Sequence, residues 1–298
     1  MTATLPEQQP AGQVVVRRPG VYDLPEEQYH ADPVPGGSLS STGARRILDC
    51  PARYHAAPQE ASRALELGTA AHKVVLGVGP ELEPIDYADW RTKAAKQAVA
   101  EARERGAIPL KRGEYEQLMG MAEALKRHPV AGPIFTEQAG KPEQSLFWQD
   151  PDTRVVCRAR LDHLPHPVKG QRLIVADYKS TASAAPQKIA RSVAEYGYHI
   201  QDAWYRDGVR ALAPQLGVDP DDVAFVFVFQ ERTPPYLVTV VELDAMAVKA
   251  GAVLAEKARR VYAECRRTGR WPGYHDHDVL TVALPAWQER AYEDEGIL

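Results

Sequence analysis

The hydrophobic residues in the first half of the chain recur at the spacing of amphipathic helices. Ser40 or Ser41 can cap a helix whose apolar residues lie three and four positions apart and which ends near Pro51. Beyond it, Gly106 and Pro109 interrupt an otherwise helical, strongly charged stretch. The periodicity predicts three further helices, over residues 65–76, 89–105 and 114–127.

The middle of the chain changes to the alternating pattern of strands. Residues 154–162 alternate polar and apolar side chains, which predicts a strand with one polar face. Residues 171–178 are predicted as its neighbour, across a turn at Lys169-Gly170. The order of elements favours an α/β or α+β fold, with a central mixed β-sheet, flanking helices and an N-terminal helical portion. Two helices, two strands and a long helix are expected next, over 186–195, 198–212, 224–230, 236–242 and 244–267.

These patterns suggest one domain behind a short lead-in. Residues 1–37 are rich in Pro, Gly and Gln, so we expect most of them to be mobile. Residues 38–298 are expected to fold as a single domain. Within it, residues 38–140 form a mainly helical portion, and residues 141–298 form the sheet that carries the chemistry with its flanking helices.

Composition narrows the class of protein only slightly. The chain has 298 residues, of which 44% are hydrophobic and 26% charged, as in ordinary globular proteins. No apolar run approaches the roughly 18 residues that cross a bilayer, and the first residues lack the pattern of a secretory signal. We therefore expect a cytoplasmic protein with no membrane partner. The net charge of −4 does not exclude a DNA enzyme, because local Arg and Lys clusters decide phosphate contact.

Two acids and a lysine are placed together by strand geometry. Side chains two apart share a face of a strand, so Asp177 and Lys179 point the same way, and Asp162 shares its face with Arg158 and Arg160. Neighbouring carboxylates repel one another, and a divalent cation relieves that repulsion. A nearby ammonium can orient or deprotonate the attacking water. Taken alone, the Asp-x-Lys pair also fits a solvated strand end, but a second acid on the preceding strand favours catalysis.

Further motifs precede and follow these residues: Leu39–Leu48 with Cys50-Pro51, Gly68–His72, Gln201 with Tyr205, and Trp271–Tyr274 with Leu284–Trp287. Together with Asp162 and Asp177-Tyr178-Lys179, and in this order along the chain, they resemble the core of the PD-(D/E)XK nuclease superfamily, and within it the RecB-like and phage-type exonuclease VIII (RecE-like) branch. The resemblance covers roughly residues 20–290. Three departures are visible: the second acid is Asp177 rather than Glu, Leu161 replaces the proline of the family name, and the three cysteines do not match a four-cysteine iron–sulfur cluster.

The resemblance implies a restriction-endonuclease-like sheet and a Mg²⁺-dependent exodeoxyribonuclease, with Mn²⁺ able to substitute and no iron–sulfur cluster. It further implies 5′→3′ digestion of duplex DNA ends, a homo-oligomer, and a single-strand annealing protein as partner in phage-type DNA recombination. Lys179, Asp177 and Asp162 are the implied catalytic residues. The implied metal ligands are His72, Asp162, Asp177 and the main-chain carbonyl of Tyr178, with Glu143 as a further acidic group near the metals.

Several residues have a plausible second interpretation. His72 alone fits an ordinary helical histidine, and Glu143 a solvated residue before a strand. Gln201 and Tyr205 lie four apart on one helical face and can hold a DNA phosphate or Lys179, or simply pack. Further candidates for substrate contact are Arg158, Arg160 and Ser180. Arg45, Arg46 and Arg53 fit a solvated helix face better than a DNA path, and His275, Asp276 and His277 fit a polar loop better than a metal cluster.

Three other functions remain open at this stage. The first is a RecB-like or structure-specific nuclease that acts on single-stranded or flap DNA. The second is a DNA-end-binding protein without turnover, which an intact set of acids and lysine disfavours. The third is a Schiff-base enzyme that uses Lys179. Digestion polarity, duplex or single-strand preference, processivity, oligomer size and the identity of an annealing partner do not follow from the sequence.

Overall fold

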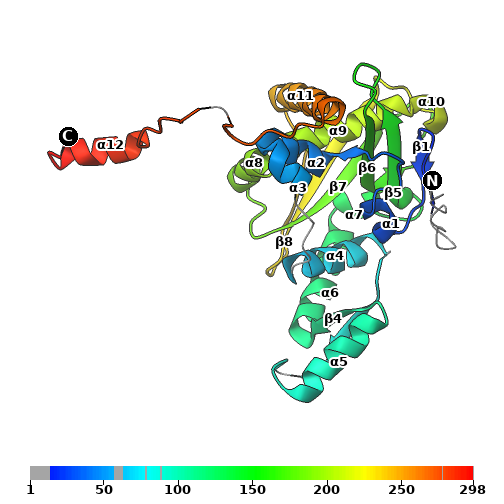
Figure 1. Ribbon diagram of the computed structural model, residues 1–298. Coiled ribbons are helices and arrows are strands. Elements are labelled where there is room, and N and C mark those ends of the chain that lie inside the picture. The colour runs from blue at the N-terminus through cyan, green and yellow to red at the C-terminus, as the bar shows by residue number, and fades with distance from the viewer. Residues whose placement is uncertain (1–13, 57–62, 78, 88, 277, 298) are drawn as a thin grey trace, which may run out of the picture.

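The computed structural model describes residues 14–56, 63–77, 79–87, 89–276 and 278–297 (Figure 1). The strands are β1 Gly20–Tyr22, β2 Leu39–Ser40, β3 Leu82–Ile85, β4 Ile108–Lys111, β5 Gly140–Gln149, β6 Val156–Pro165, β7 Leu173–Thr181, β8 Val223–Glu231 and β9 Val238–Val241. The helices are α1 Glu26–His30, α2 Ser41–Asp49, α3 Pro51–Ala56, α4 Arg63–Leu76, α5 Lys93–Glu104, α6 Arg112–Arg127, α7 Ala131–Ile134, α8 Pro186–Glu195, α9 Tyr198–Ala211, α10 Ala213–Leu216, α11 Ala245–Thr268 and α12 Ala286–Asp294.

The predicted helices are confirmed, and several of them begin at capping residues. The Ser40 hydroxyl accepts a hydrogen bond from the Gly43 N–H at 3.1 Å and starts α2. Asp244 caps α11 in the same way, and that helix ends at Gly269 in the left-handed conformation. The charged helix predicted from residue 89 begins later, at α5, because the Thr92 side chain caps it.

A seven-stranded sheet is the centre of the described residues. Its order is β1-β5-β6-β7-β8-β9, and β2 pairs with β6 off this path. Strands β5, β6 and β7 are antiparallel, β7 and β8 are parallel, and β8 and β9 are antiparallel. The expected mixed sheet with flanking helices is therefore confirmed.

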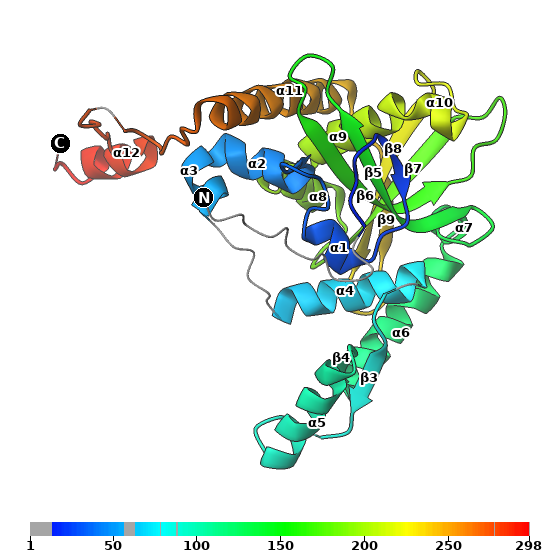
Figure 2. The same cartoon turned by 45° about the vertical axis from the view of Figure 1, so that its right-hand side comes forward.

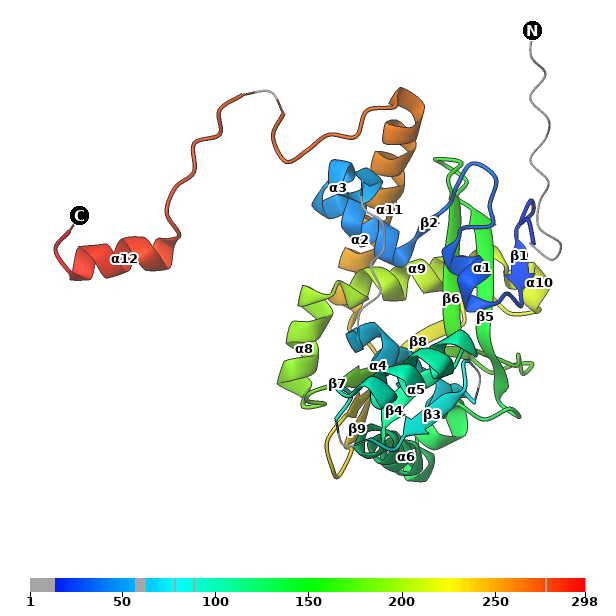
Figure 3. The same cartoon turned by 60° about the horizontal axis from the view of Figure 1, so that its bottom comes forward.

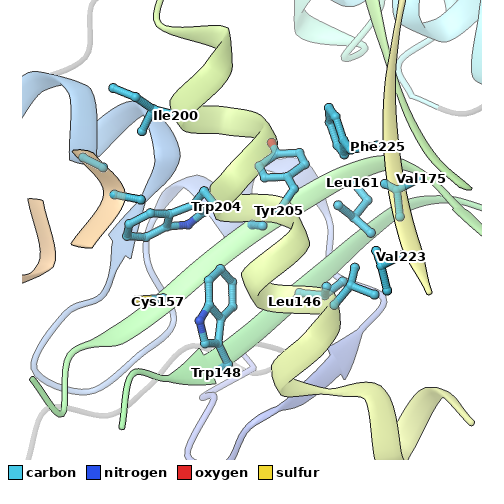
Figure 4. Close-up of a cluster of buried hydrophobic side chains, with 14 of the residues drawn as sticks. Leu146, Trp148, Cys157, Leu161, Val175, Ile200, Trp204, Tyr205, Val223 and Phe225 are labelled. Atoms are coloured by element: carbon cyan, nitrogen blue, oxygen red, sulfur yellow. The ribbon is translucent and has the colours of Figure 1, made fainter. Parts of the chain in front are cut away.

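Helices α2, α9 and α11 cover one face of this sheet. Figure 4 shows part of the apolar layer between the sheet and these helices. Alternation along β6 supplies the layer, since Cys157 and Leu161 both point into it. Trp204 of α9 is fully buried there, with its ring 5.8 Å from that of Trp148 and its Nε1–H donating to the Arg158 carbonyl at 3.0 Å. These contacts hold α9 against β6 and so fix the position of its N-terminal half.

The opposite face carries α4, α6 and α7 (Figure 2). Tyr178 of β7 and Val228 of β8 are fully buried there against Ala71 of α4 and Leu125 of α6. Helix α6 continues away from the sheet toward α5 and the parallel pair β3–β4, which form a small outlying layer (Figure 2). Ile174 near the start of β7 is exposed, whereas Val175 and Ala176, on opposite faces of the strand, are both buried, so both faces are covered directly before Asp177.

Residues 14–37 are packed against the sheet, so the expectation of a mobile lead-in was wrong for them. Strand β1 pairs with β5, and Asp32 forms an ion pair with Arg158 of β6. The apolar residues of this segment are widely spaced in the sequence, and only the surface around Phe147 of β5 brings them together. Residues 1–13 lie outside the described residues. The buried cluster around Phe147 contains Val16, Leu24, Tyr29 and Val34.

The C-terminal end leaves the body of the molecule. Figures 1 and 3 show α12 at the end of an extended segment, away from the sheet and its helices. The start of this segment is held down, because the Pro272 carbonyl accepts a hydrogen bond from the Ala52 N–H at 3.0 Å and Trp271 stacks on His55. Among the described residues, no helix is long and apolar enough to cross a membrane.

Candidate active site

The site forms where strands β6 and β7 separate. The two strands are paired at His163 and Ala176, whereas the same edge of β6 is paired with β2 near Arg158. Asp162 lies between these pairings, and its Oδ2 accepts a hydrogen bond from the Tyr178 main-chain N–H at 2.6 Å. The Asp162 side chain thereby takes the place of a main-chain bond and holds the diverging strands at a fixed separation.

Asp177 and Lys179 extend from β7 toward α9. The buried carboxylate of Asp177 accepts a hydrogen bond from Gln201 Nε2 at 2.6 Å through Oδ1 and forms an ion pair with Lys179 through Oδ2. The structure therefore places Gln201 against an acid, rather than against Lys179 as one prediction had it. Tyr178, between the two, points to the opposite face, as strand alternation requires.

Asp162 is electrostatically strained. Burial raises its pKa well above the usual value, and repulsion from Asp177 raises it further. The Lys179 ammonium and the hydrogen bond from Tyr178 act in the opposite direction but do not cancel these effects. A carboxylate in this position gains stability from any additional positive charge that approaches it.

Asp162 belongs to a cluster of three side chains of the kind that bind metals. One side-chain ligand atom each from His72, Glu143 and Asp162 all lie within 4.8 Å of one another. His72 comes from α4, with its Nδ1 at 3.6 Å from Asp162 Oδ1, and Glu143 comes from β5, whose register sets Pro142 opposite His163. Burial, reinforced by Lys179, lowers the pKa of His72, which favours the neutral imidazole that binds metals.

Glu143 reaches this group through an unusual backbone conformation. Its φ of 55° lies in the left-handed region, although it sits within β5. Its carboxylate also forms an ion pair with Arg160, whose NH1 donates to the Leu24 carbonyl at 2.8 Å. The sequence placed Glu143 before a strand rather than inside one, and no local signal predicts this conformation. Left-handed backbone at a non-glycine residue is uncommon and costs conformational energy, and such strain recurs at functional sites.

Lys179 lies in an aromatic enclosure. Its Nζ is 5.0 Å from the ring centre of Tyr198 and 5.9 Å from that of Phe227. Burial would lower its pKa, but Asp177 and Asp162 more than compensate and raise it. The side chain is therefore an ammonium ion, held by a carboxylate and by the faces of two rings.

A cleft of about 1320 Å³ opens beside the group of ligand atoms. It is bordered by α1, α2 and α4, and His72, Glu143, Asp162 and Tyr205 line it. Arg158 and Arg160 line it as well, but their guanidinium groups already have partners in the N-terminal segment. The structure thus engages both arginines in holding residues 14–37 on the sheet, in addition to any contact with a substrate.

Residues outside the predicted set also support the site. Gln230 is fully buried: its Oε1 accepts a hydrogen bond from the Tyr178 hydroxyl at 2.8 Å, and its Nε2 donates to the Met121 carbonyl of α6 at 2.8 Å. The Tyr178 ring in turn meets the His72 ring edge-on at 5.5 Å. A polar Gln at the end of the apolar run of β8 was a visible signal for Gln230, whereas no sequence signal singled out Tyr198 as a contact of Lys179.

The remaining predicted residues are more distant or have other partners. Tyr205 is buried beside Gln201, and burial together with Asp177 raises its pKa. Ser180 follows Lys179 on β7 and is partly exposed. Arg53 donates to the Tyr274 hydroxyl at 2.7 Å, away from the site, and His275 belongs to the exposed C-terminal segment. His277 lies outside the described residues. Cys50, Cys157 and Cys265 are buried free thiols.

Comparisons with known proteins bear on the family and the fold of this chain. Residues 40–278 match the model of a family described as a PDDEXK-like domain of unknown function (DUF3799). A crystal structure described as a "Putative exonuclease" from Eubacterium rectale aligns with a TM-score of 0.56 and 14% identity, over 91% of this chain and 99% of that one. The structure of SSO0001 aligns with a TM-score of 0.28 and 11% identity, over 74% and 84% of the two chains.

A search of curated proteins found no match. At 14% identity the Eubacterium rectale structure shows a shared fold alone. The family model, however, spans most of the chain and includes the residues that form the site, so it supports a nuclease. The chain therefore belongs to the PDDEXK-like family, and with it to the PD-(D/E)XK nuclease superfamily.

Proposed function

We propose that the protein is a divalent-metal-dependent deoxyribonuclease that hydrolyses phosphodiester bonds at the site between β6 and β7. The observation that carries this proposal is the meeting of His72, Glu143 and Asp162 within 4.8 Å, next to the Asp177–Lys179 pair. Neither the cluster of ligand atoms nor the ion pair indicates a nuclease by itself, since exposed acids are common and buried ion pairs are often structural. Their combination supplies both ligands for a metal and a cation for the reacting phosphate.

The donor set fits a hard divalent cation such as Mg²⁺, with Mn²⁺ as a substitute. His72, Glu143 and Asp162 offer one nitrogen and two carboxylates, and the raised pKa of Asp162 marks a buried charge that lacks compensation. Asp177 and the main-chain carbonyl of Tyr178 are the further ligands that we propose. When bound, the metal supplies Lewis-acid activation of water and of the phosphate.

The surrounding residues have separate tasks. Lys179 holds a positive charge beside the position where the phosphate develops negative charge, and it can orient the attacking water. Gln201 fixes the Asp177 carboxylate through its hydrogen bond, which leaves Oδ2 directed at Lys179. Asp162, anchored on the Tyr178 N–H, keeps one oxygen bonded while the other faces His72.

The narrower proposal is a 5′→3′ exonuclease that acts on duplex DNA ends in phage-type recombination. It includes a cytoplasmic homo-oligomer and a single-strand annealing protein as partner, and it rests on the motif resemblance. A second candidate is cleavage of single-stranded or flap DNA. The exposed ring of Tyr196, beside the start of α9, favours this candidate because it offers a surface on which an unpaired base can stack.

Digestion of linear DNA with Mg²⁺ tests the proposal. Blunt duplex and single-stranded substrates, labelled at either end, are compared for the wild type, Asp177→Asn and Lys179→Met. Each variant should lower kcat by about 10²–10³-fold or more, whereas Lys169→Met, an exposed lysine in the β6–β7 turn, should be unaffected. Equal rates for all four proteins, or full activity in EDTA, would refute the assignment. The position of the label in the first products decides polarity.

A further inference from the structure

An exposed aromatic ring leads from the surface toward the Lys179 ammonium. Tyr196, at the end of α8, is 49% exposed, and its ring centre lies 5.7 Å from that of Tyr198. Tyr198 is the ring that contacts Lys179, with 5.0 Å between its centre and Nζ. Two successive rings therefore connect solvent to the amine of the site. The proposed hydrolysis does not involve the outer ring.

The backbone presents Tyr196 in a fixed position. Gly197 follows it in the left-handed conformation, with φ of 63°, and turns the chain from α8 into α9. The Tyr196 N–H donates to the Ser192 carbonyl at 2.9 Å, and the Tyr196 carbonyl accepts a hydrogen bond from Arg45 of α2. A Cβ at Gly197 would lie 2.7 Å from Arg45 Cδ, so glycine is needed for this close approach. The main chain at Tyr196 is thus bonded on both sides while the ring is left in solvent.

The two helices that meet at this corner, α8 and α2, carry several cationic side chains, and α8 also ends with the exposed acid Glu195. Helix α8 carries the exposed side chains of Lys188 and Arg191, for which no ion pair is found among the described residues. Arg45 lies beneath the corner, and its neighbour Arg46 lines the cleft. Figure 3 shows α8 and the start of α9 beside α2, in agreement with the contact between Arg45 and Tyr196. Helix α2 therefore borders the cleft through Arg46 and the aromatic corner through Arg45.

An exposed aromatic face with cationic side chains on the adjacent helices fits one class of ligand well. Single-stranded nucleic acid combines exposed base faces, which stack on aromatic rings, with a phosphate backbone that follows positive charge. In duplex DNA the base faces are covered except at the end, so the same surface has much less to offer it. We propose that Tyr196 is a stacking platform for an unpaired nucleobase of the DNA strand that enters the site, with Arg45, Lys188 and Arg191 beside the strand's phosphates. This inference rests on the proposed nuclease function and specifies its substrate as single-stranded or frayed DNA.

Binding in EDTA tests the platform without turnover. The probe is a short single-stranded oligodeoxynucleotide that carries 2-aminopurine, whose fluorescence falls when the base stacks. Tyr196→Ala should weaken binding by about 5- to 150-fold, which corresponds to the roughly 1–3 kcal/mol of one base–aromatic stack, and it should abolish the quenching. Tyr196→Phe and Tyr196→Trp keep a ring and should restore both. Blunt duplex of the same sequence should bind the wild type and Tyr196→Ala alike.

Tyr87→Ala provides a matched control, since Tyr87 is 42% exposed and lies between β3 and α5, in the outlying layer of Figure 2. It should bind the probe as the wild type does. In Mg²⁺, Tyr196→Ala should raise KM for the single strand while kcat at saturation is retained, because the ring positions the strand and does not act on the phosphate. A fall in kcat with KM unchanged would show disturbance of Tyr198 and Lys179 and would overturn the platform.

Two outcomes separate the platform from the nuclease proposal. If Tyr196→Ala binds the probe as tightly as the wild type, or Tyr196→Trp binds as weakly as Tyr196→Ala, the platform is refuted even if the wild type cleaves DNA. If the wild type fails to cleave any DNA with Mg²⁺ while Tyr196→Ala still loses binding, the nuclease proposal is refuted. The platform then stands as a single-strand binding site.

Discussion

Replacement of Asp162 by Asn should make the protein more stable and inactive at once. The carboxylate is buried, and burial together with Asp177 raises its pKa well above the usual value of 3.8. An acid whose pKa is higher in the folded state destabilises the fold once it is ionised. This penalty is absent well below pH 3.8, grows as the pH rises from 3.8 to the folded pKa, and stays constant above that pKa. Asn removes the charge and keeps an oxygen that can accept the Tyr178 N–H.

The expected gain follows from this balance. In EDTA at neutral pH the Asp162→Asn variant should be more stable by about 0.5–2 kcal/mol, the usual range for removal of a local conflict. For a domain of this size that corresponds to a rise in Tm of roughly 1–8 °C. The wild type, in contrast, should gain about 2.7 kcal/mol when Mg²⁺ is present at about 100 times its Kd. The variant should lose most of this response, because one of the proposed ligands is gone.

Thermal unfolding followed by circular dichroism, in EDTA and in Mg²⁺, measures both effects. Asp150→Asn is the matched control, since Asp150 is also a buried acid but is paired with Arg259 at 3.0 Å. It should lower Tm in both buffers and leave the Mg²⁺ response intact. The reasoning fails if Asp162→Asn unfolds at a lower temperature than the wild type in EDTA, or if Mg²⁺ stabilises the two proteins equally.

Three further predictions concern positions around the site. Gln201→Leu removes the hydrogen bond to Asp177 and should lower Mg²⁺ affinity or kcat by about 10–100-fold, with the fold retained. Titration calorimetry measures the affinity and DNA digestion measures kcat; if both are unchanged, Gln201 is not part of the site. Trp204→Ala should cost about 3–5 kcal/mol of unfolding free energy in urea, since the ring is fully buried, and a loss under 1 kcal/mol would contradict the described core. Gln230→Leu leaves the Tyr178 hydroxyl buried without a partner and should cost about 1–3 kcal/mol, whereas the double variant with Tyr178→Phe should recover part of that loss.

Local sequence patterns determined the strands and the pairing of residues along them. Alternation alone put Asp177 and Lys179 on one face of β7 and Tyr178 on the other, because successive side chains of any strand alternate. The capping serine at position 40 or 41 likewise located the start of α2, since a cap bonds to an amide only a few residues away. Information of this kind is contained in short segments and does not depend on how the rest of the chain folds.

The composition of the N-terminal segment wrongly suggested mobility, because its burial depends on contacts with distant parts of the chain. Its apolar residues Leu24 and Tyr29 have no periodicity of their own, and they are buried only because Phe147 of β5 lies beneath them. The contact between Gln201 and Asp177 was equally invisible, because it depends on how closely α9 packs on the sheet. That distance is set by Trp204 and its neighbours, whose shapes interlock only in the folded core.

What the sequence determined by itself was the set of reactive groups and their order: an acid at the end of one strand, an acid and a lysine on the next, and a histidine on an earlier helix. Tertiary structure alone decided which of them meet. His72 reaches Asp162 because α4 packs on β7. Glu143 joins them for two reasons: the pairing of β5 with β6 brings it level with Asp162, and its backbone turns into the left-handed region. Contacts between distant segments depend on the packing of the whole domain, so no local pattern contains them.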